Sequence, residues 1–76
     1  MFFVYILKDT VTQQLYVGSC ENLERRLSEH KLRRPTYKLI YQEIRGTRSE
    51  AFIREMFFKT GNGRRVLKGL LAKQST

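Results

Sequence analysis

The sequence predicts a small α/β protein of the α+β type, built around a mostly antiparallel sheet in the element order β-β-α-β-α-α. Three observations lead to this fold class. A nearly continuous apolar run opens the chain, a second short strand follows after one polar turn, and apolar residues later recur at helical spacing. The chain has 76 residues, so we expect residues 1–76 to form one domain with one small core.

The first two strands are expected to pair directly. The run from Phe2 to Leu7 is rich in β-branched and aromatic residues, which indicates a central strand buried on both faces. The polar segment 8–14 lacks a helical period and is expected to be a turn. Because this connection to the second strand, residues 15–19, is short, the two strands should form an antiparallel hairpin.

The first helix is predicted to begin just after the second strand, with either Ser19 or Asn22 as its N-cap. Leu23 and Leu27 form a narrow apolar stripe along it. The segment 31–37 is expected to be a loop, because the residue before a proline is disfavoured in a helix.

A candidate site surrounds the start of this helix. Tyr16 lies near the end of the second strand, and Gly18 allows a sharp turn or a close backbone approach. Arg26 and His30 are one turn apart and flank the apolar stripe, whereas Arg25 points away from it. The helical period therefore favours Arg26 rather than Arg25 as the functional arginine.

The second half of the chain predicts one strand and two helices. Residues 38–45 are expected to be the third strand, and the Thr47 to Glu50 segment has the pattern of a capping box. The second helix should run to about residue 60, with Gly61 as its C-cap and a turn at 62–63. Its expected core face comprises Phe52, Ile53, Met56 and Phe57.

The last helix is predicted over residues 64–73. Its period places one group of apolar residues toward the core and its basic residues toward solvent. The expected inward group is Val66, Leu67, Leu70 and Leu71.

Composition narrows the class of protein. Fifteen Lys and Arg against seven acids give a net charge of +8, which favours a polyanionic partner, most often nucleic acid. A single cysteine fits a reducing compartment and excludes a cysteine-rich zinc site. The opening apolar run is too short to span a membrane, so we expect a cytoplasmic protein without a membrane partner.

Several pieces of the chain, in their order and spacing, resemble the GIY-YIG nuclease superfamily. The resemblance is to its small stand-alone bacterial members, which are related to the N-terminal domain of the excinuclease C subunit. Val4 stands where the first motif usually has glycine. The pieces are Val4-Tyr5-Ile6, Tyr16-Val17-Gly18, Asn22-Leu23-x-x-Arg26-x-x-x-His30 and Glu50-Ala51-x-x-x-Glu55-x-x-x-Lys59.

The resemblance implies a three-stranded antiparallel sheet flanked by helices, and an endonuclease that hydrolyses DNA phosphodiester bonds with one Mg²⁺ or Mn²⁺ ion. It further implies that Tyr5, Tyr16, Arg26, His30 and Glu55 are catalytic, that Glu55 binds the metal, and that Gly18 is the structural glycine of the motif.

The chemistry of these residue types fits that activity. A carboxylate can anchor a metal ion, and a guanidinium can hold phosphate oxygens. Tyr16 is the candidate to position or deprotonate the attacking water, Tyr5 would assist it, and His30 would relay a proton or hold Tyr16. Each residue also has a structural interpretation; for example, Glu55 at i, i+4 from Lys59 is spaced for a simple ion pair.

The sequence leaves the function open between two main alternatives. The chain is either a nuclease, in DNA repair, recombination or defence, or a non-catalytic nucleic-acid-binding module with the same fold. RNA binding is a third alternative, a partner protein would direct cleavage, and the sequence leaves the oligomeric state open. The cations expected to contact nucleic acid are Arg25, Arg33, Arg34, Lys38, Arg64, Arg65 and Lys68.

Overall fold

The computed structural model describes residues 1–74 and confirms the predicted order of elements. Three antiparallel strands form one sheet in the order β2-β1-β3, so that β1 is central and β2 and β3 are edges. The strands are β1 (Phe2–Asp9), β2 (Leu15–Cys20) and β3 (Tyr37–Arg45), and the helices are α1 (Leu23–Arg33), α2 (Arg48–Phe58) and α3 (Gly61–Gln74).

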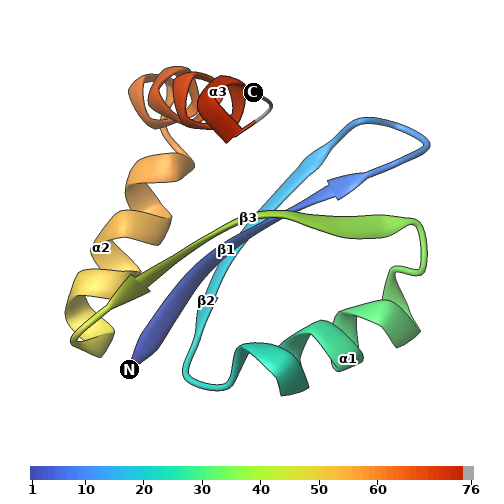
Figure 1. The fold of residues 1–76 in the computed structure, drawn as a ribbon, viewed down its shortest axis with the longest axis horizontal. Coiled ribbons are helices and arrows are strands. Elements are labelled where there is room, and N and C mark those ends of the chain that lie inside the picture. Colours follow the sequence, from blue (N-terminus) through green and yellow to red (C-terminus); the bar gives the residue numbers. More distant parts are fainter. Residues whose placement is uncertain (75–76) are drawn as a thin grey trace.

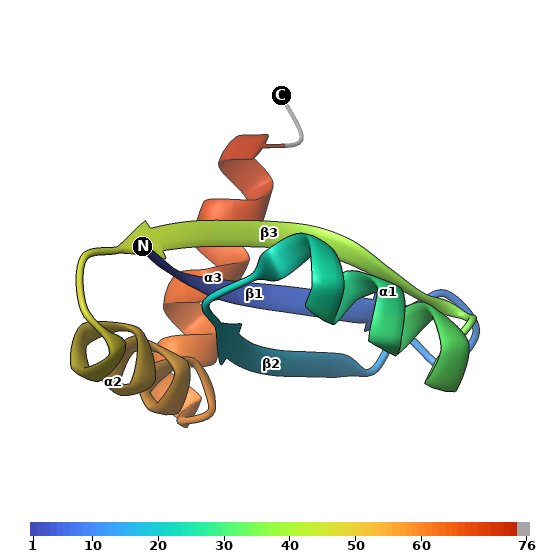
Figure 2. The ribbon, with the colours of Figure 1, turned by 90° about the horizontal axis from the view of Figure 1, so that it is seen from below.

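Strand β1 is buried on both faces, as its apolar run predicted. Val4 and Ile6 point into one core with α2 and α3, whereas Tyr5 and Leu7 point into a second core on the face beneath α1. Figure 1 shows α1 on one side of the sheet and α2 with α3 on the other, and Figure 2 shows the same layers from below. The site residues of the two faces are therefore separated by the sheet.

Helix α1 begins as predicted but ends later. Asn22 is its N-cap, because its side-chain oxygen accepts a hydrogen bond from the Arg25 backbone N–H at 3.0 Å. The prediction of a loop from residue 31 was wrong for residues 31–33, which complete the last helical turn. Pro35 restricts only the residue before it, and Arg34 is accordingly the C-cap.

The predicted core face of α2 was wrong for three of its four residues, since only Phe57 packs against the core. Phe52, Ile53 and Met56 are 54%, 68% and 46% exposed, whereas Ala51 and Phe58 are buried. The helix is thus rotated about its axis relative to the prediction. That rotation turns Glu55, which lies on the buried side, toward β2.

Helix α3 begins at Gly61, three residues earlier than predicted, so the expected turn at 62–63 is helical. The Thr60 hydroxyl accepts a hydrogen bond from the Gly63 N–H at 3.0 Å, which starts the new helix immediately after α2. A Cβ on Gly63 would lie 1.7 Å from the Phe57 carbonyl oxygen, so only glycine permits this close approach. Leu67 is buried as expected, but Val66 is 43% exposed.

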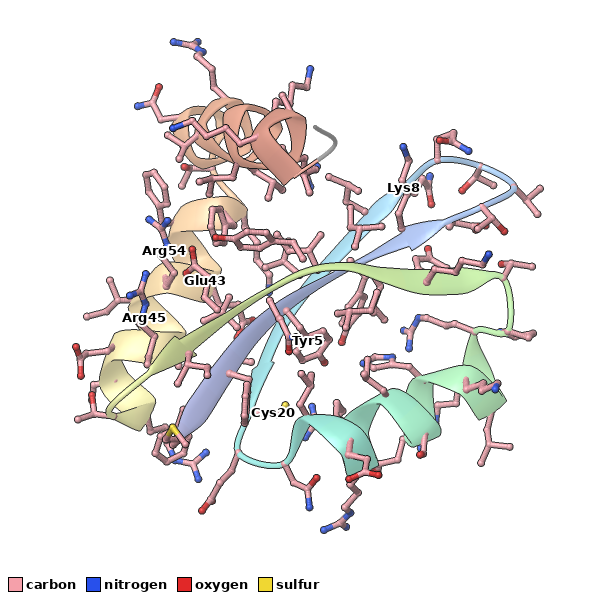
Figure 3. The ribbon with its side chains drawn as sticks, viewed as in Figure 1. Tyr5, Lys8, Cys20, Glu43, Arg45 and Arg54 are labelled. Carbon is pink, nitrogen blue, oxygen red and sulfur yellow. The ribbon has the colours of Figure 1, made fainter. Side chains whose placement is uncertain are left out.

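A charged cluster joins β3 to α2, as Figure 3 shows beside Arg54. The Glu43 carboxylate accepts two hydrogen bonds from Arg54, at 2.9 and 3.0 Å, and one from Arg45 at 3.0 Å. The Tyr41 hydroxyl donates to the same carboxylate at 2.5 Å. The Arg54 guanidinium also lies 4.4 Å from the ring centroid of Phe58. This cluster fixes the position of α2 against the sheet.

Candidate active site

The site is built on the pairing of β1 with β2, in which Tyr5 lies opposite Gly18. Tyr5 is fully buried, and its ring fills the space above Gly18. A Cβ at position 18 would lie 2.5 Å from the Tyr5 hydroxyl oxygen. The motif glycine is therefore required because the tyrosine ring of the neighbouring strand occupies the place of a side chain.

His30 connects both tyrosines. Its Nε2 lies 2.8 Å from the Tyr5 hydroxyl oxygen in a buried hydrogen bond. Its ring centroid is 4.8 Å from that of Tyr16 and 5.5 Å from that of Tyr5, with edge-on geometry in both cases. The structure thus brings Tyr5, Tyr16 and His30 together, as the sequence predicted, although they lie on three different elements.

Arg26 completes this cluster on the solvent side. Its guanidinium forms an ion pair with Glu29 at 3.4 Å and is half exposed. Burial raises the pKa of Tyr5 to about 12, and hydrogen bonding from Arg26 opposes that rise. Tyr5 is consequently a neutral phenol at pH 7. Burial, followed by the nearby Arg34 and Arg26 charges, lowers the pKa of His30, which favours the neutral imidazole.

Glu55 lies on the other side of β2. One of its carboxylate oxygens accepts a hydrogen bond from the Ser19 hydroxyl at 2.5 Å, and the other is 2.8 Å from the Lys59 ammonium. The predicted ion pair with Lys59 is confirmed. The contact with Ser19 was not predicted, and the only signal for it is that Ser19 directly follows the motif glycine.

Strand β2 therefore carries both halves of the site. Successive side chains of a strand point to opposite faces, so Tyr16 faces His30 while Ser19 faces Glu55. The partners of Glu55 are Ser19 and Lys59 rather than the tyrosine cluster. Strand β2 is also an edge of the sheet.

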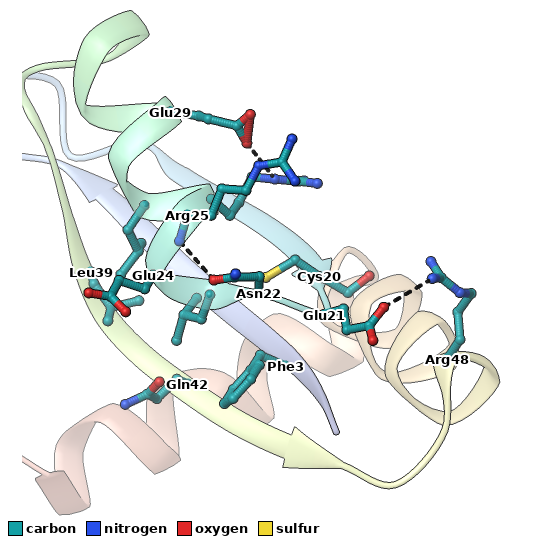
Figure 4. A pocket seen from close by; sticks show the side chains of 14 residues that line it. Phe3, Cys20, Glu21, Asn22, Glu24, Arg25, Glu29, Leu39, Gln42 and Arg48 are labelled. Carbon is teal, nitrogen blue, oxygen red and sulfur yellow. Dashed lines mark hydrogen bonds and ion pairs between the residues drawn. The ribbon is translucent and has the colours of Figure 1, made fainter.

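Two hollows lie next to the cluster. A small one of about 320 Å³ is lined by Tyr16, Arg26, Glu29, His30, Arg33 and Arg34. A larger groove of about 1000 Å³ runs between α1 and β3, with Phe3 and Leu39 in its wall and the Arg48–Glu21 ion pair at its end (Figure 4). Arg26 lines both hollows and connects them.

The cations predicted to contact nucleic acid do not share one surface. Arg33 and Arg34 line the small hollow, and Arg25 lines the groove. Lys38 is exposed on β3, and the α3 cations are exposed on the opposite face of the sheet from α1 (Figure 1). The members of that α3 group are Arg64, Arg65 and Lys68.

Among residues 1–74, no three His, Cys, Asp or Glu side chains are grouped to hold a metal ion. The carboxylate of Glu29 lines the small hollow and pairs with Arg26, whereas that of Glu55 is held by Ser19 and Lys59 on the other face of the sheet. In the same residues, no helix has both the length and the apolar character needed to cross a membrane.

The site thus combines two tyrosines, an arginine and a histidine on one face of the sheet with the Glu55 carboxylate beside edge strand β2 on the other. The profile of the GIY-YIG catalytic domain matches residues 1–68. The chain therefore belongs to the GIY-YIG family.

Its relatives include a UPF0213 protein of Staphylococcus saprophyticus, which is 36% identical over 75 residues, covering 87% of this chain and 89% of the relative. UPF0213 proteins of Staphylococcus aureus strains Mu3 and Mu50 have the same identity and coverage. No solved structure is significantly similar to this chain.

Proposed function

We propose that residues 1–76 form a divalent-metal-dependent endonuclease domain that hydrolyses DNA phosphodiester bonds. The observation that supports this most is the pair of half-sites on β2: a tyrosine–histidine–arginine cluster on one face and a Ser19-held carboxylate on the other. A module that only bound phosphates would gain nothing from the Glu55 carboxylate, which even when paired with Lys59 weakens the attraction for phosphate unless a metal ion lies between them.

The donor set fits a hard divalent cation. Mg²⁺ and Mn²⁺ prefer oxygen ligands and retain several waters, so one carboxylate can anchor them. The Glu55 side chain is 15% exposed, and Ser19 fixes its orientation through one oxygen. A metal ion bound by Glu55 would supply Lewis-acid stabilisation of the charge that develops on the phosphate.

The remaining residues have distinct roles in the proposed reaction. Arg26, half exposed beside the small hollow, donates hydrogen bonds to the non-bridging phosphate oxygens. Tyr16 lines that hollow and is half-buried there, so it would position the attacking water or, once it has given up its own proton, deprotonate it. Tyr5 is fully buried and holds its proton, which makes it an assisting group rather than the base.

The composition of the chain supports a cellular setting. A net charge of +8 favours DNA as the substrate over an uncharged ligand, and the single cysteine fits a cytoplasmic enzyme. Repair, recombination or defence against foreign DNA would each use such a domain, with a partner protein directing where it cuts.

The test is nicking of supercoiled plasmid by the wild type and by Glu55→Gln, with Mg²⁺, Mn²⁺ or EDTA. The wild type should nick only with metal, and Glu55→Gln should lose at least about 100-fold in rate. Glu24→Gln, which removes an exposed carboxylate from α1, is the matched control and should keep its activity.

Two results would contradict the nuclease proposal. The first is equal nicking by Glu55→Gln and by the wild type. The second is DNA binding without cleavage of any plasmid, branched or single-stranded substrate, which would favour the non-catalytic binding module instead.

A further inference from the structure

Arg34 is held beside His30 by its backbone as well as its side chain. It is the C-cap of α1, and its N–H donates to the His30 carbonyl oxygen at 2.6 Å. Its backbone, at φ −135° and ψ 69°, has left the helical region, and the following Pro35 disfavours a return to it. The side chain therefore turns back over the helix end instead of extending into solvent.

The guanidinium of Arg34 defines which nitrogen of His30 carries the proton. Its Nη1 lies 3.3 Å from His30 Nδ1. A guanidinium only donates hydrogen bonds, so Nδ1 must present its lone pair. The proton of the neutral ring is then on Nε2, from which it is donated to the Tyr5 hydroxyl oxygen at 2.8 Å.

The same guanidinium also packs on the second tyrosine. Its central carbon lies 4.7 Å from the centroid of the Tyr16 ring, which also lies against the rings of His30 and Tyr5. A planar cation suits this position because it can stack on an aromatic ring while its edge donates a hydrogen bond. Arg34 thus contacts two of the proposed catalytic residues at once.

We propose that Arg34 is a positioning residue, which holds His30 as a neutral hydrogen-bond donor to Tyr5 and fixes the ring of Tyr16. Its catalytic consequence rests on the nuclease function proposed above. In this arrangement His30 does not accept the Tyr5 proton. The histidine orients the phenol instead.

Nuclear magnetic resonance of the imidazole tests the first part directly, because the chain has one histidine. Long-range ¹H–¹⁵N spectra of the wild type at neutral pH should show Nδ1 unprotonated and Nε2 protonated. The groups that face His30 are Tyr5, Tyr16, Arg26, Glu29, Arg33 and Arg34. Loss of one of these cations in Arg34→Met should raise the midpoint of the His30 titration.

Lys31→Met is the matched control, since Lys31 is an exposed cation on the same helical turn. Lys31→Met should leave the imidazole signals and the midpoint of the His30 titration unchanged. A protonated Nδ1 in the wild type, or the same midpoint in Arg34→Met as in Lys31→Met, would overturn the proposal.

Cleavage kinetics test the second part. Arg34→Met should lose about 10- to 100-fold in kcat with a small change in KM, as is typical when a group that orients a ligand or catalytic residue is removed. Arg34→Lys should not restore the kcat, because an ammonium cannot stack on Tyr16 and donate to His30 together. Full recovery of kcat by Arg34→Lys, or a pure KM effect in Arg34→Met, would show that Arg34 only attracts phosphate.

The two proposals fail in distinguishable ways. A wild type that never cuts DNA contradicts the nuclease function in the plasmid assay. The imidazole spectra still decide whether Arg34 sets the state of His30.

Discussion

Replacement of Gly18 by alanine is expected to reduce activity far more than stability. The new Cβ would lie 2.5 Å from the Tyr5 hydroxyl oxygen and 2.6 Å from the ring carbon that bears it, whereas ordinary contacts begin at 3.4 Å. The end of the Tyr5 ring would therefore have to withdraw by roughly 1 Å. The hydrogen bond from His30, now 2.8 Å long, would be stretched or broken by such a movement.

The packing around Tyr5 sets the size of both expected losses, in stability and in activity. Tyr5 is fully buried, so relief of the overlap should cost about 1–3 kcal/mol of the free energy of unfolding. A displacement of about 1 Å at a catalytic group can cost about 100-fold in rate. The fold should thus survive Gly18→Ala while plasmid nicking falls to the limit of detection.

Urea unfolding and plasmid nicking of the same samples check this prediction. Gly69→Ala is the control, since no atom lies within 4 Å of the added Cβ and alanine favours a helix by about 1 kcal/mol. Gly69→Ala should be equally or more stable and fully active. Wild-type activity and stability in Gly18→Ala would refute the claim that the motif glycine exists to make room for Tyr5.

Two further predictions concern stability. Gly63→Ala should lower the free energy of unfolding by at least about 3 kcal/mol, because the new Cβ would overlap the Phe57 backbone carbonyl, which cannot rotate away. A thermal unfolding midpoint equal to that of Gly69→Ala would contradict this. Burial alone would raise the pKa of Glu43, but hydrogen bonds from Arg54 and Tyr41 hold it below its usual 4.5. That stabilisation is present at neutral pH and is lost as pH falls below about 4.5. Glu43→Gln should therefore lower the free energy of unfolding by about 1–3 kcal/mol at pH 7, and by less at pH 3; equal losses at both pH values in urea titrations would contradict it.

The fold was largely predictable because its signals are local. The apolar run at Phe2 identified the central strand, and the Thr47 cap located the start of α2, where its hydroxyl accepts from the Glu50 N–H at 3.1 Å. The spacing of Arg26 and His30 on one helix likewise placed both beside the tyrosines. Regular periods and caps are properties of the chain alone, so they can be identified before the tertiary structure is known.

The rotation of α2 could not be predicted from its apolar residues. Hydrophobicity favoured Phe52, Ile53 and Met56 as the buried side, yet the Glu43–Arg54 pair and the Ser19–Glu55 hydrogen bond both require the opposite side to face the sheet. These are contacts between residues distant in sequence. The contacts of Arg34 were missed for a similar reason, since a surface arginine and a positioning arginine are identical in a sequence.

Helix α1 is attached to the rest of the molecule in an unusual way. Among its residues, all of which the structure describes, His30 is the only buried one. The side chain that orients Tyr5 is thus also the deepest contact holding that helix to the sheet. A substitution at His30 changes two properties together, and an inactive variant would not by itself establish a catalytic role. Hydrogen exchange along α1 would separate them, because a helix that opens more often exchanges its amide protons faster even when the sheet stays intact.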